Sequence, residues 1–316
     1  MTKVLITTDT ELSPALHERG LDPRENFEIM VMGRGSDATV GIAYQMDRLN
    51  AHGLKGVFFV EALSAHALGL DMLKRVVEPI LTRGHEVQLH VHTEWLQWIE
   101  KDPVAGRRGE NIFEFPESHQ RILLEMGADA LERAGAPRPI AFRAGNYGAD
   151  NATLRALKSL GLRFDTSYNQ PYIGDICRID VPEPLLEPAL VEGLTEVPIT
   201  FFEDYPGHTR PLQLCAISTA ELAWCVADAR AANRPTVVIV SHSFELLNAR
   251  RTRANKMLVR RFDALCATLQ ETTTFAELDA SVEPTARRSA IPKSNPARTV
   301  VRMVEQAVGT LLYDRA

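Results

Sequence analysis

Three histidines and two glutamates lie within residues 84–95, in the segment GHEVQLHVHTEW. In an extended strand alternate side chains share a face, so this segment would direct its polar side chains to one side and its valines and leucine to the other. The polar face would carry Gln88, His90, His92 and Glu94. Two imidazoles one strand step apart can bind a single metal ion. Histidines without a ligand role are the competing interpretation of this segment taken alone.

Polar side chains also end two other predicted strands. The run VLITT at residues 4–8 is followed by Asp9 and Glu11, which share a face by the same two-residue period. His242 comes directly after the run VVIVS. The carboxyl ends of parallel strands are where barrel enzymes place catalytic groups, whereas capping of a helix is the alternative role for Asp9.

A glycine-rich turn follows a further predicted strand, in the segment AFRAGNYG at residues 141–148. Such a turn can direct backbone N–H groups at an oxyanion, and the guanidinium of Arg143 before it can fix a carboxylate through two hydrogen bonds. Asp165, in FDTSY, is another polar residue at a strand end. Polar residues at five strand ends together predict a site at the mouth of a barrel.

Short β-branched runs alternate with segments of helical periodicity along most of the chain. Strands are predicted at residues 4–8, 56–60, 86–91, 139–143, 163–167, 195–202, 236–241 and 274–275. Helices are predicted at residues 42–54, 70–81, 118–134, 151–160, 222–231 and 254–269. This alternation indicates a parallel sheet that closes into a barrel, and no Gly-x-Gly-x-x-Gly follows a strand to support dinucleotide binding.

Three polar insertions and a tail interrupt this pattern. The insertions at residues 12–36, 96–117 and 170–194 follow strand ends and could shape a substrate site or be inert surface elaborations. Residues 280–298 have the composition of a linker. We therefore predict a catalytic barrel over residues 1–280, followed by a linker and an amphipathic helix over residues 281–316.

The apolar residues of this tail lie on one side of the predicted helix. We expect that side to pack on the barrel or on a partner subunit, which would make a homo-oligomer through the C-terminal helix. A role at a membrane surface is the weaker alternative, because basic residues are sparse within the helix.

Composition excludes several function classes. The net charge of −6 and the pI near 5.9 provide no basic field for nucleic acid, so a small or neutral substrate is favoured. The widely spaced cysteines Cys177, Cys215, Cys225 and Cys266 indicate reduced thiols. The N-terminus has too short an apolar run for a signal peptide, and no segment offers the roughly twenty consecutive apolar residues of a membrane span. We expect a cytoplasmic protein without a membrane span.

The polar strand ends resemble, in order, the five motifs of the polysaccharide deacetylases of carbohydrate esterase family 4. The matching segments are TTDTE, LHVH, FRAGNYG, FDTSY and VIVSHS, and the segments LNAHGLKGVFFV, RGHEVQLH and TTFAEL are similar to the family's framework. The resemblance covers about residues 1–280 and leaves the tail outside. It implies a distorted (β/α)7-type barrel, here with a C-terminal helical extension, and one divalent metal, usually zinc.

The resemblance also implies a ligand set. His90 and His92 would bind the metal together with Glu11, with Asp9 or Glu94 in reserve. The family's first motif has two adjacent aspartates where this chain has Asp9 and Thr10, and its second motif spaces the histidines by four residues, which would place a ligand at Glu94. We favour His92 because imidazole suits zinc and the strand period directs it correctly.

The remaining motif residues would transfer protons and position groups. Asp9 would accept a proton from water, His242 would protonate the departing amine, and Arg143 would keep Asp9 ionised and oriented. Asp165 would be a partner of His242 or Arg143. Backbone N–H groups of the turn Gly145, Asn146 and Tyr147 would stabilise the oxyanion.

The predicted function is therefore metal-dependent hydrolysis of an N-acetyl group on an amino sugar or glycan precursor, with release of acetate. Two alternatives remain open at this point. One is an amidohydrolase acting on a small non-sugar amide or ureide. The other is a non-catalytic carbohydrate-binding module that has kept the same fold.

Overall fold

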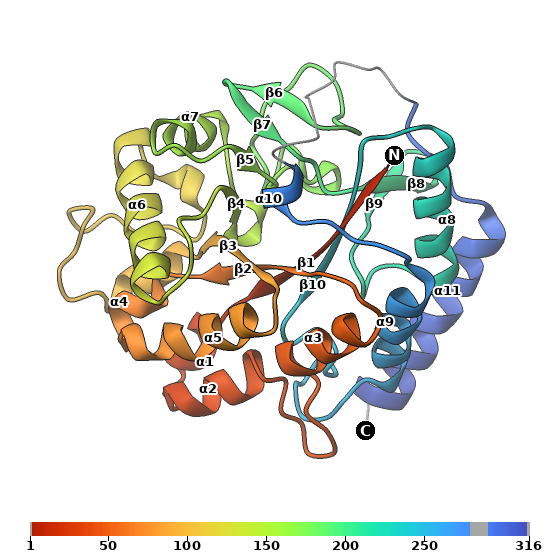
Figure 1. Ribbon diagram of the computed structural model, residues 1–316, viewed down its shortest axis with the longest axis horizontal. Coiled ribbons are helices and arrows are strands. Elements are labelled where there is room, and N and C mark those ends of the chain that lie inside the picture. The colour runs from red at the N-terminus through yellow and green to blue at the C-terminus, as the bar shows by residue number, and fades with distance from the viewer. Residues whose placement is uncertain (1, 279–289, 315–316) are drawn as a thin grey trace. The chain divides into compact units, whose positions relative to one another are not determined.

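A computed structural model describes residues 2–278 and 290–314 (Figure 1). The chain divides into two compact units. The first unit comprises residues 1–56, 200–273 and 289–316, and the second comprises residues 57–199 and 274–288. Eight strands follow the hydrogen-bonded order β10-β1-β2-β3-β4-β5-β7-β6. The predicted class, an α/β fold of distorted barrel type with a C-terminal helix, is confirmed.

The strands of the first unit pair in parallel at its centre. β1 (Lys3–Thr10) pairs with β10 (Thr236–His242), in a register that runs from Lys3 opposite Thr236 to Asp9 opposite His242. Both strands are almost entirely buried, as their uninterrupted β-branched runs predict. β8 (Phe201–Tyr205) and β9 (His208–Pro211) form a separate antiparallel hairpin.

Helices of the first unit flank this strand pair, and three of them share one apolar core with it. The helices of this unit are α1 (Pro14–Glu18), α2 (Pro23–Met30), α3 (Ile42–Ala51), α8 (Thr219–Ala231), α9 (Lys256–Thr268) and α11 (Pro296–Gly309). Side chains of α3, α8 and α9 such as Leu49, Leu222 and Phe262 bury against Val4 and Ile239 of the strands. The start of α9 is capped by Asn255, whose side-chain oxygen accepts from two backbone N–H groups.

The second unit contains the other strands of the sheet. β2 (Val57–Glu61), β3 (Glu86–Val91), β4 (Ala141–Ala144), β5 (Phe164–Asp165) and β7 (Leu194–Glu196) are parallel. β6 (Ala189–Val191) adds to β7 in the antiparallel direction. The carboxyl ends of the parallel strands thus meet at one edge, which is where the predicted site residues of this unit lie.

Helices and short helical turns connect these strands. Figure 1 shows α5 (Leu70–Thr82), α6 (Glu117–Arg133) and α7 (Asn151–Ser159) beside the strands of the second unit. The shorter helices are α4 (Ser64–Leu68) and α10 (Phe275–Leu278). Short 3₁₀ helices cover Thr93–Trp98, Ile112–Glu114, Gly145–Tyr147 and Gln170–Tyr172.

Two predicted strands are wrong in detail. Thr274 and Phe275 begin α10 instead of a strand, because Thr274 and Glu277 cap each other's backbone N–H groups. This is the Thr-x-x-Glu capping pattern, which is readable in the sequence. The predicted strand at residues 195–202 is two strands, β7 and β8, separated around Pro198, which has no N–H to donate.

Two further predictions concern the tail and the membrane. Residues 280–289 of the predicted linker lie outside the described part of the chain, so the boundary between a barrel over 1–280 and a tail over 281–316 stays a prediction. The helix predicted after it is present as α11, which continues as a π-helical turn over Thr310–Asp314. Among the described residues, no helix combines the length and the apolar character needed to cross a bilayer.

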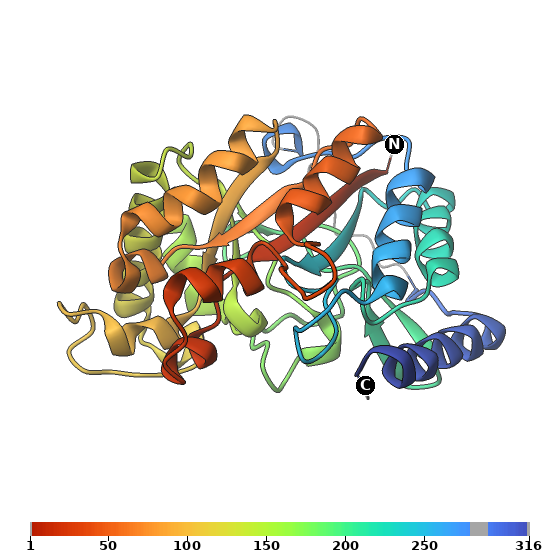
Figure 2. The same ribbon diagram turned by 90° about the horizontal axis from the view of Figure 1, so that it is seen from below.

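A buried ion cluster attaches α11 to the first unit. Figure 1 and Figure 2 show α11 beside α8 and α9. The guanidinium of Arg302 donates to Asp204 at 2.6 Å and to Glu221 at 3.1 Å, and all three side chains are buried. Asp204 also accepts from Arg210 at 2.7 Å and from His208. Burial alone would raise the pKa of Asp204, but the hydrogen bonds from His208 and Arg210 hold it below its usual value.

We expect Arg302→Ala to destabilise the first unit by about 3–5 kcal/mol, because it leaves two carboxylates buried without their shared cation. Denaturant unfolding monitored by circular dichroism measures this loss. The control is Lys293→Ala, which removes a 3.1 Å ion pair with Glu203 from a lysine that is 73% exposed. That variant should change stability by less than about 1 kcal/mol. Equal effects of the two substitutions would contradict a structural role for the buried cluster.

Candidate active site

The carboxyl ends of β1 and β10 bring a carboxylate and an imidazole together in the first unit. His242 Nε2 lies 3.9 Å from Asp9 Oδ2, as expected for residues opposite each other in the strand register. The buried side chain of Gln45 on α3 connects the two strand ends. It accepts from Thr8 Oγ1 at 3.1 Å and donates to the carbonyl oxygen of His242 at 3.1 Å. The separation of Asp9 and His242 is therefore fixed by backbone pairing and by one buried amide.

Glu245 orients the imidazole of His242. Its Oε2 accepts from His242 Nδ1 at 2.9 Å, and its Oε1 accepts from the backbone N–H of Cys215 at 2.6 Å. The hydrogen bond from Nδ1 to Glu245 orients the ring so that Nε2 faces Asp9. Sequence reasoning missed Glu245, although its position three residues after His242 in SHSFE places it in the turn that follows the strand.

The electrostatic surroundings favour the protonated form of His242. Burial lowers the pKa of this imidazole, but the hydrogen bond and charge of Glu245, followed by the charges of Asp9 and Glu11, raise it from 6.5 to about 9. The side chain is therefore an imidazolium at neutral pH. A cation with a proton on Nε2 is suited to donate that proton to a leaving group.

His90 and His92 occupy the carboxyl end of β3 in the second unit, and each has a partner for Nδ1. His90 Nδ1 donates to the carbonyl oxygen of Arg143 at 2.7 Å, and His92 Nδ1 donates to the carboxylate of Glu94 at 3.2 Å. Their ring centroids lie 4.9 Å apart. A histidine that donates through Nδ1 binds a metal through Nε2, which is the usual arrangement for metal-binding histidines.

The turn after β4 leaves room for the ring of His92. A Cβ atom at Gly145 would lie 2.8 Å from His92 Nδ1 and 2.8 Å from the carbonyl oxygen of Val91, so only glycine fits there. Asn146 and Tyr147 both adopt positive φ, at 55° and 60°. Two consecutive non-glycine residues in this region are strained, and such strain is concentrated at functional sites. The turn that the sequence singled out is thus both sterically and conformationally constrained.

Arg143 is fully buried on β4. Its guanidinium lies over the ring of Phe59, 4.4 Å from the centroid, and its Nε donates to the carbonyl oxygen of Thr166 at 3.3 Å. A cation over an aromatic ring recovers part of the free energy lost on burial. This packing fixes the position of the charge on the second unit.

Asp165 holds the end of β4 through Ser167. Its two carboxylate oxygens accept from Ser167 Oγ at 2.7 Å and from the Ser167 N–H at 3.0 Å, and Ser167 Oγ in turn accepts from the Ala144 N–H at 2.9 Å. Burial raises the pKa of Asp165, while hydrogen bonds with Glu196 and Ser167 and the charge of Arg143 oppose this rise. Of the two partners that the sequence left open, Arg143 is near Asp165 within the second unit.

Two buried carboxyl groups beside the site were not found from the sequence. Glu196 lies opposite Asp165 in the strand register, and burial followed by the negative charge of Asp165 raises the pKa of Glu196 well above the usual value. Glu61, at the end of β2, accepts from the N–H groups of Leu63 and Ser64 at 2.8 and 3.0 Å. Burial raises the pKa of Glu61. Glu61 ends β2 and Glu196 ends β7, so both occupy the carboxyl end of a strand, where the sequence predicts site residues.

A polar cleft of about 700 Å³ lies in the second unit, beside the turn at residues 145–148. Its lining includes Arg107, Arg108, Arg178 and Asn111. Asn111 packs so closely against the turn that a Cβ atom at Gly148 would lie 2.4 Å from its Oδ1. The insertion at residues 96–117, predicted to follow a strand end, therefore places Asn111 against the turn and contributes Arg107, Arg108 and Glu114 to the lining of the cleft.

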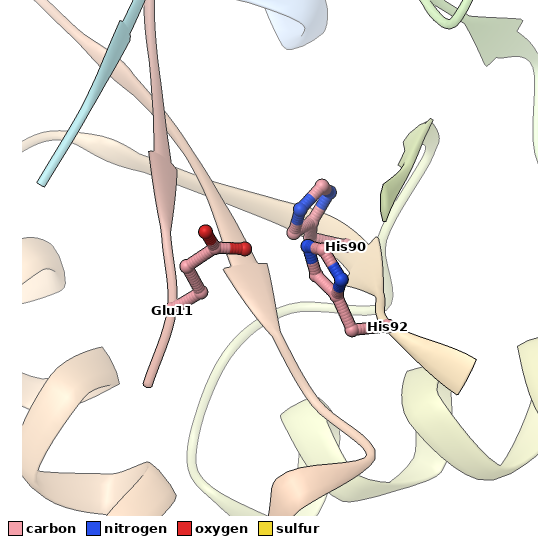
Figure 3. A group of neighbouring side chains, drawn as sticks. All are labelled: Glu11, His90 and His92. Carbon is pink, nitrogen blue, oxygen red and sulfur yellow. The ribbon is translucent and has the colours of Figure 1, made fainter. Parts of the chain in front are cut away.

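Among the described residues, Glu11, His90 and His92 form a group that could hold a metal ion (Figure 3). Each offers one ligand atom, and these atoms lie within 4.8 Å of one another. The two residues held in reserve have other contacts: Asp9 faces His242, and Glu94 accepts from His92. One carboxylate and two imidazoles are a donor set that zinc and several other divalent ions accept.

Comparison with solved structures shows that this is the fold of the polysaccharide deacetylases. The chain is similar to a provisionally assigned polysaccharide deacetylase from Mycobacterium smegmatis, with a TM-score of 0.53, 17% sequence identity, and coverage of 91% of this chain and 94% of the other. It is also similar to a 4-alpha-glucanotransferase from Thermococcus litoralis, with a TM-score of 0.51, 13% identity, and coverage of 90% and 39%.

A family 4 carbohydrate esterase from Streptomyces lividans in complex with acetate aligns with a TM-score of 0.42 and 16% identity, over 92% of this chain and 98% of that one. No family model matches the sequence. No curated protein matches it either. Proteins with different reactions share the fold at these low identities, so the fold is established and the reaction must be argued from the side chains.

We expect Glu245→Gln to lower the pKa of His242 by about one unit or more, because an amide keeps the hydrogen bond to Nδ1 but removes the negative charge. The imidazole resonances of His242 in an NMR pH titration measure this shift. Glu271→Gln, which changes an exposed acid in the same unit, is the control. An unchanged titration in Glu245→Gln would assign the raised pKa to other charges.

The same shift sets a pH dependence of stability. Because the folded-state pKa of about 9 lies above the usual 6.5, the imidazolium stabilises the folded state fully below pH 6.5. This contribution is lost as the pH rises through about 9. The Glu245→Gln variant should lose it at lower pH than the unchanged protein.

Proposed function

We propose that this protein is a metal-dependent N-deacetylase that hydrolyses the N-acetyl group of an amino sugar or glycan precursor and releases acetate. The observation that carries the proposal is the group Glu11, His90 and His92, whose ligand atoms lie within 4.8 Å of one another. The pair Asp9 and His242, at the end of the strand that leads to Glu11, supports it. The fold, which is that of the polysaccharide deacetylases, agrees with this reaction class.

The donor set fits a divalent metal, with zinc as the first candidate. Hydrogen bonds from Nδ1 of both histidines set the tautomer that a metal requires, and a carboxylate completes three protein ligands. Three protein ligands with an open position are typical of catalytic zinc sites. A zinc ion bound there would polarise the acetyl carbonyl and lower the pKa of water toward neutrality.

The side chains of the first unit divide the proton transfers between them. Asp9 takes the proton of the attacking water as general base, and His242 gives its Nε2 proton to the departing amine as general acid. Glu245 keeps His242 in the orientation and charge state that this donation needs. Arg143 orienting Asp9, as the sequence predicted, is part of the same proposal.

The second unit would bind the substrate. Backbone N–H groups of the turn Gly145, Asn146 and Tyr147 would donate to the oxyanion of the tetrahedral intermediate. Arginines of the neighbouring cleft, Arg107, Arg108 and Arg178, suit a sugar precursor that carries anionic groups such as phosphates. The expected cytoplasmic location and the homo-oligomer remain predictions.

We expect Asp9→Asn to lower kcat for acetate release by about 10²–10⁴-fold, because the amide cannot accept the proton of water. Acetate released from a panel of N-acetylamino sugars and small N-acyl amides by the Zn²⁺-loaded protein is the readout, and bound zinc is determined by elemental analysis. Asp129→Asn, on the surface of α6, is the matched control. Unchanged turnover in Asp9→Asn would remove Asp9 from the reaction, and the absence of acetate with every substrate would contradict deacetylation.

We expect Gly145→Ala to weaken Zn²⁺ binding about tenfold or more, because the added methyl group displaces the ring of His92. Competition with a chromogenic chelator measures the affinity without any substrate. A thermal unfolding midpoint measured on the same sample separates loss of the site from loss of the fold. Unchanged zinc affinity in a folded variant would show that His92 is not a ligand.

A further inference from the structure

α11 turns its apolar side chains to solvent and its polar side chains to the first unit. Large apolar side chains on α11 and the turn after it are 41% to 60% exposed. They are Val300, Val301, Met303, Val304, Val308, Leu311 and Leu312. The charged residues of the same stretch, Arg302 and Glu305, point inward and are ion-paired with Asp204, Glu221 and Arg261.

This orientation is fixed by the inner face of the helix. Besides the Arg302 cluster, Thr299 Oγ1 donates to the carbonyl oxygen of Asp204 at 3.0 Å, and Glu305 accepts from Arg261 at 2.7 Å. Rotating α11 to bury its valines would break these buried ionic contacts. A contiguous exposed apolar face of this kind marks a surface that binds a protein or a membrane.

A strongly basic segment borders the apolar face. Residues 246–262 carry six basic residues and no acidic one, in a chain whose net charge is −6. They are Arg250, Arg251, Arg253, Lys256, Arg260 and Arg261. The excess of positive charge is therefore local to the loop before α9 and the first half of that helix.

The contacts of this segment place it against the C-terminal end of α11. Arg253 donates to the carbonyl oxygen of Leu312 at 2.7 Å, and Asn248 donates to that of Tyr313 at 2.9 Å. On α9, Arg261 is paired with Glu305 of α11. Lys256 and Arg260 lie on the neighbouring row of α9 and are exposed. Exposed cations thus line the border of the apolar face.

An exposed aromatic residue lies near the other end of the helix. Tyr205, on the hairpin of β8 and β9, is 53% exposed and directly follows Asp204, which holds Thr299 and Arg302 of α11. Tyrosine is among the residues enriched where a protein meets the interface between lipid and water. The patch thus combines an apolar face, an aromatic residue and a basic border.

We propose that the exposed face of α11, with Tyr205 and the basic residues of 246–262, docks onto the surface of an anionic lipid bilayer. The apolar side chains enter the boundary between headgroups and acyl chains, and the exposed cations contact anionic headgroups. A single weak attachment does not hold a protein on a membrane, whereas an apolar face together with a basic cluster does. The helix lies in the plane of the interface and does not span it.

The charges favour this occupant over a second copy of the chain. Pairing of α11 with itself about a two-fold axis would bring two basic borders toward each other, and like charges at an interface oppose association. The sequence favours packing of the apolar side on the barrel or on a partner subunit, because the helix itself carries few basic residues; in the structure that side is exposed and does not pack on the barrel. The structure supplies the missing cations from α9 and the loop before it.

Sedimentation of the full chain with vesicles tests the proposal without any turnover, so its outcome is independent of the proposed deacetylation. We expect the protein to bind vesicles of phosphatidylcholine and phosphatidylglycerol, and to bind vesicles of phosphatidylcholine alone much more weakly. Binding should fall as salt is raised, because the headgroup contacts are screened. Equal binding to the two kinds of vesicle, or binding to neither, would overturn the proposal.

Two sets of variants separate the contributions. Val304→Glu with Leu311→Glu should reduce binding about a hundredfold or more by removing apolar burial. Arg250→Gln with Arg260→Gln should reduce it roughly thirtyfold. The control is Leu190→Glu, which changes a side chain that is 67% exposed on β6 and should bind like the unchanged protein. All these positions are exposed, so unfolding midpoints should be unaltered.

Analytical ultracentrifugation of the same proteins identifies the competing occupant. A monomer that binds anionic vesicles supports the proposal. A dimer that does not bind vesicles and that dissociates in the Val304→Glu, Leu311→Glu variant would show that a second copy covers α11, and the proposal would be wrong.

Discussion

The parallel pairing of β1 with β10 is the constraint on which the proton-transfer half of the site depends. Seven consecutive residue pairs, from Lys3 with Thr236 to Asp9 with His242, fix how far each strand extends. A slip of one residue would turn Asp9 into the opposite face of the sheet. Gln45 resists such a slip because its amide holds both strand ends at once. The chemistry of Asp9 and His242 is therefore a consequence of register.

In the second unit the same edge is held by buried hydrogen bonds. A chain of contacts runs from Asp165 through Ser167 to the N–H of Ala144, immediately before the turn that makes room for His92. Every polar group in this chain is buried, so each depends on its neighbour for a partner. Asp165, one of the residues that the sequence singled out, therefore supports the turn after β4 through Ser167.

Much of the fold and of the candidate site could be predicted from the sequence, because both follow from period and position. Runs of β-branched residues indicate buried parallel strands, and polar residues at the ends of these strands must lie at the carboxyl edge of the sheet. This reasoning predicts Asp9, His90, Arg143 and His242 as site residues. Glu245, which orients His242, is not predicted by this reasoning, because the hydrogen-bond partner of a side chain in a turn depends on how the turn folds.

The orientation of α11 was beyond the sequence for a related reason. Its pattern indicates two faces, but a pattern does not say which face is turned inward, and the usual expectation is that apolar residues are buried. The decision belongs to Asp204 and Glu221, far from α11 in the chain, whose charges require Arg302 inside. The strand predicted at residues 274–275 is wrong for a simpler reason. The Thr-x-x-Glu pattern of a helix start is visible in the sequence at Thr274 and Glu277.

The raised pKa of Glu196 beside Asp165 has a consequence for the pH dependence of stability. An acid whose pKa is raised on folding makes the folded state relatively less favourable as the pH rises from its ordinary pKa to the raised folded-state pKa. A glutamine in its place would carry no such penalty. The carboxyl pair on β5 and β7 thus lowers the stability of the second unit as the pH rises above the ordinary pKa of a glutamate, opposite in direction to any acid denaturation of the ion pairs that hold α11.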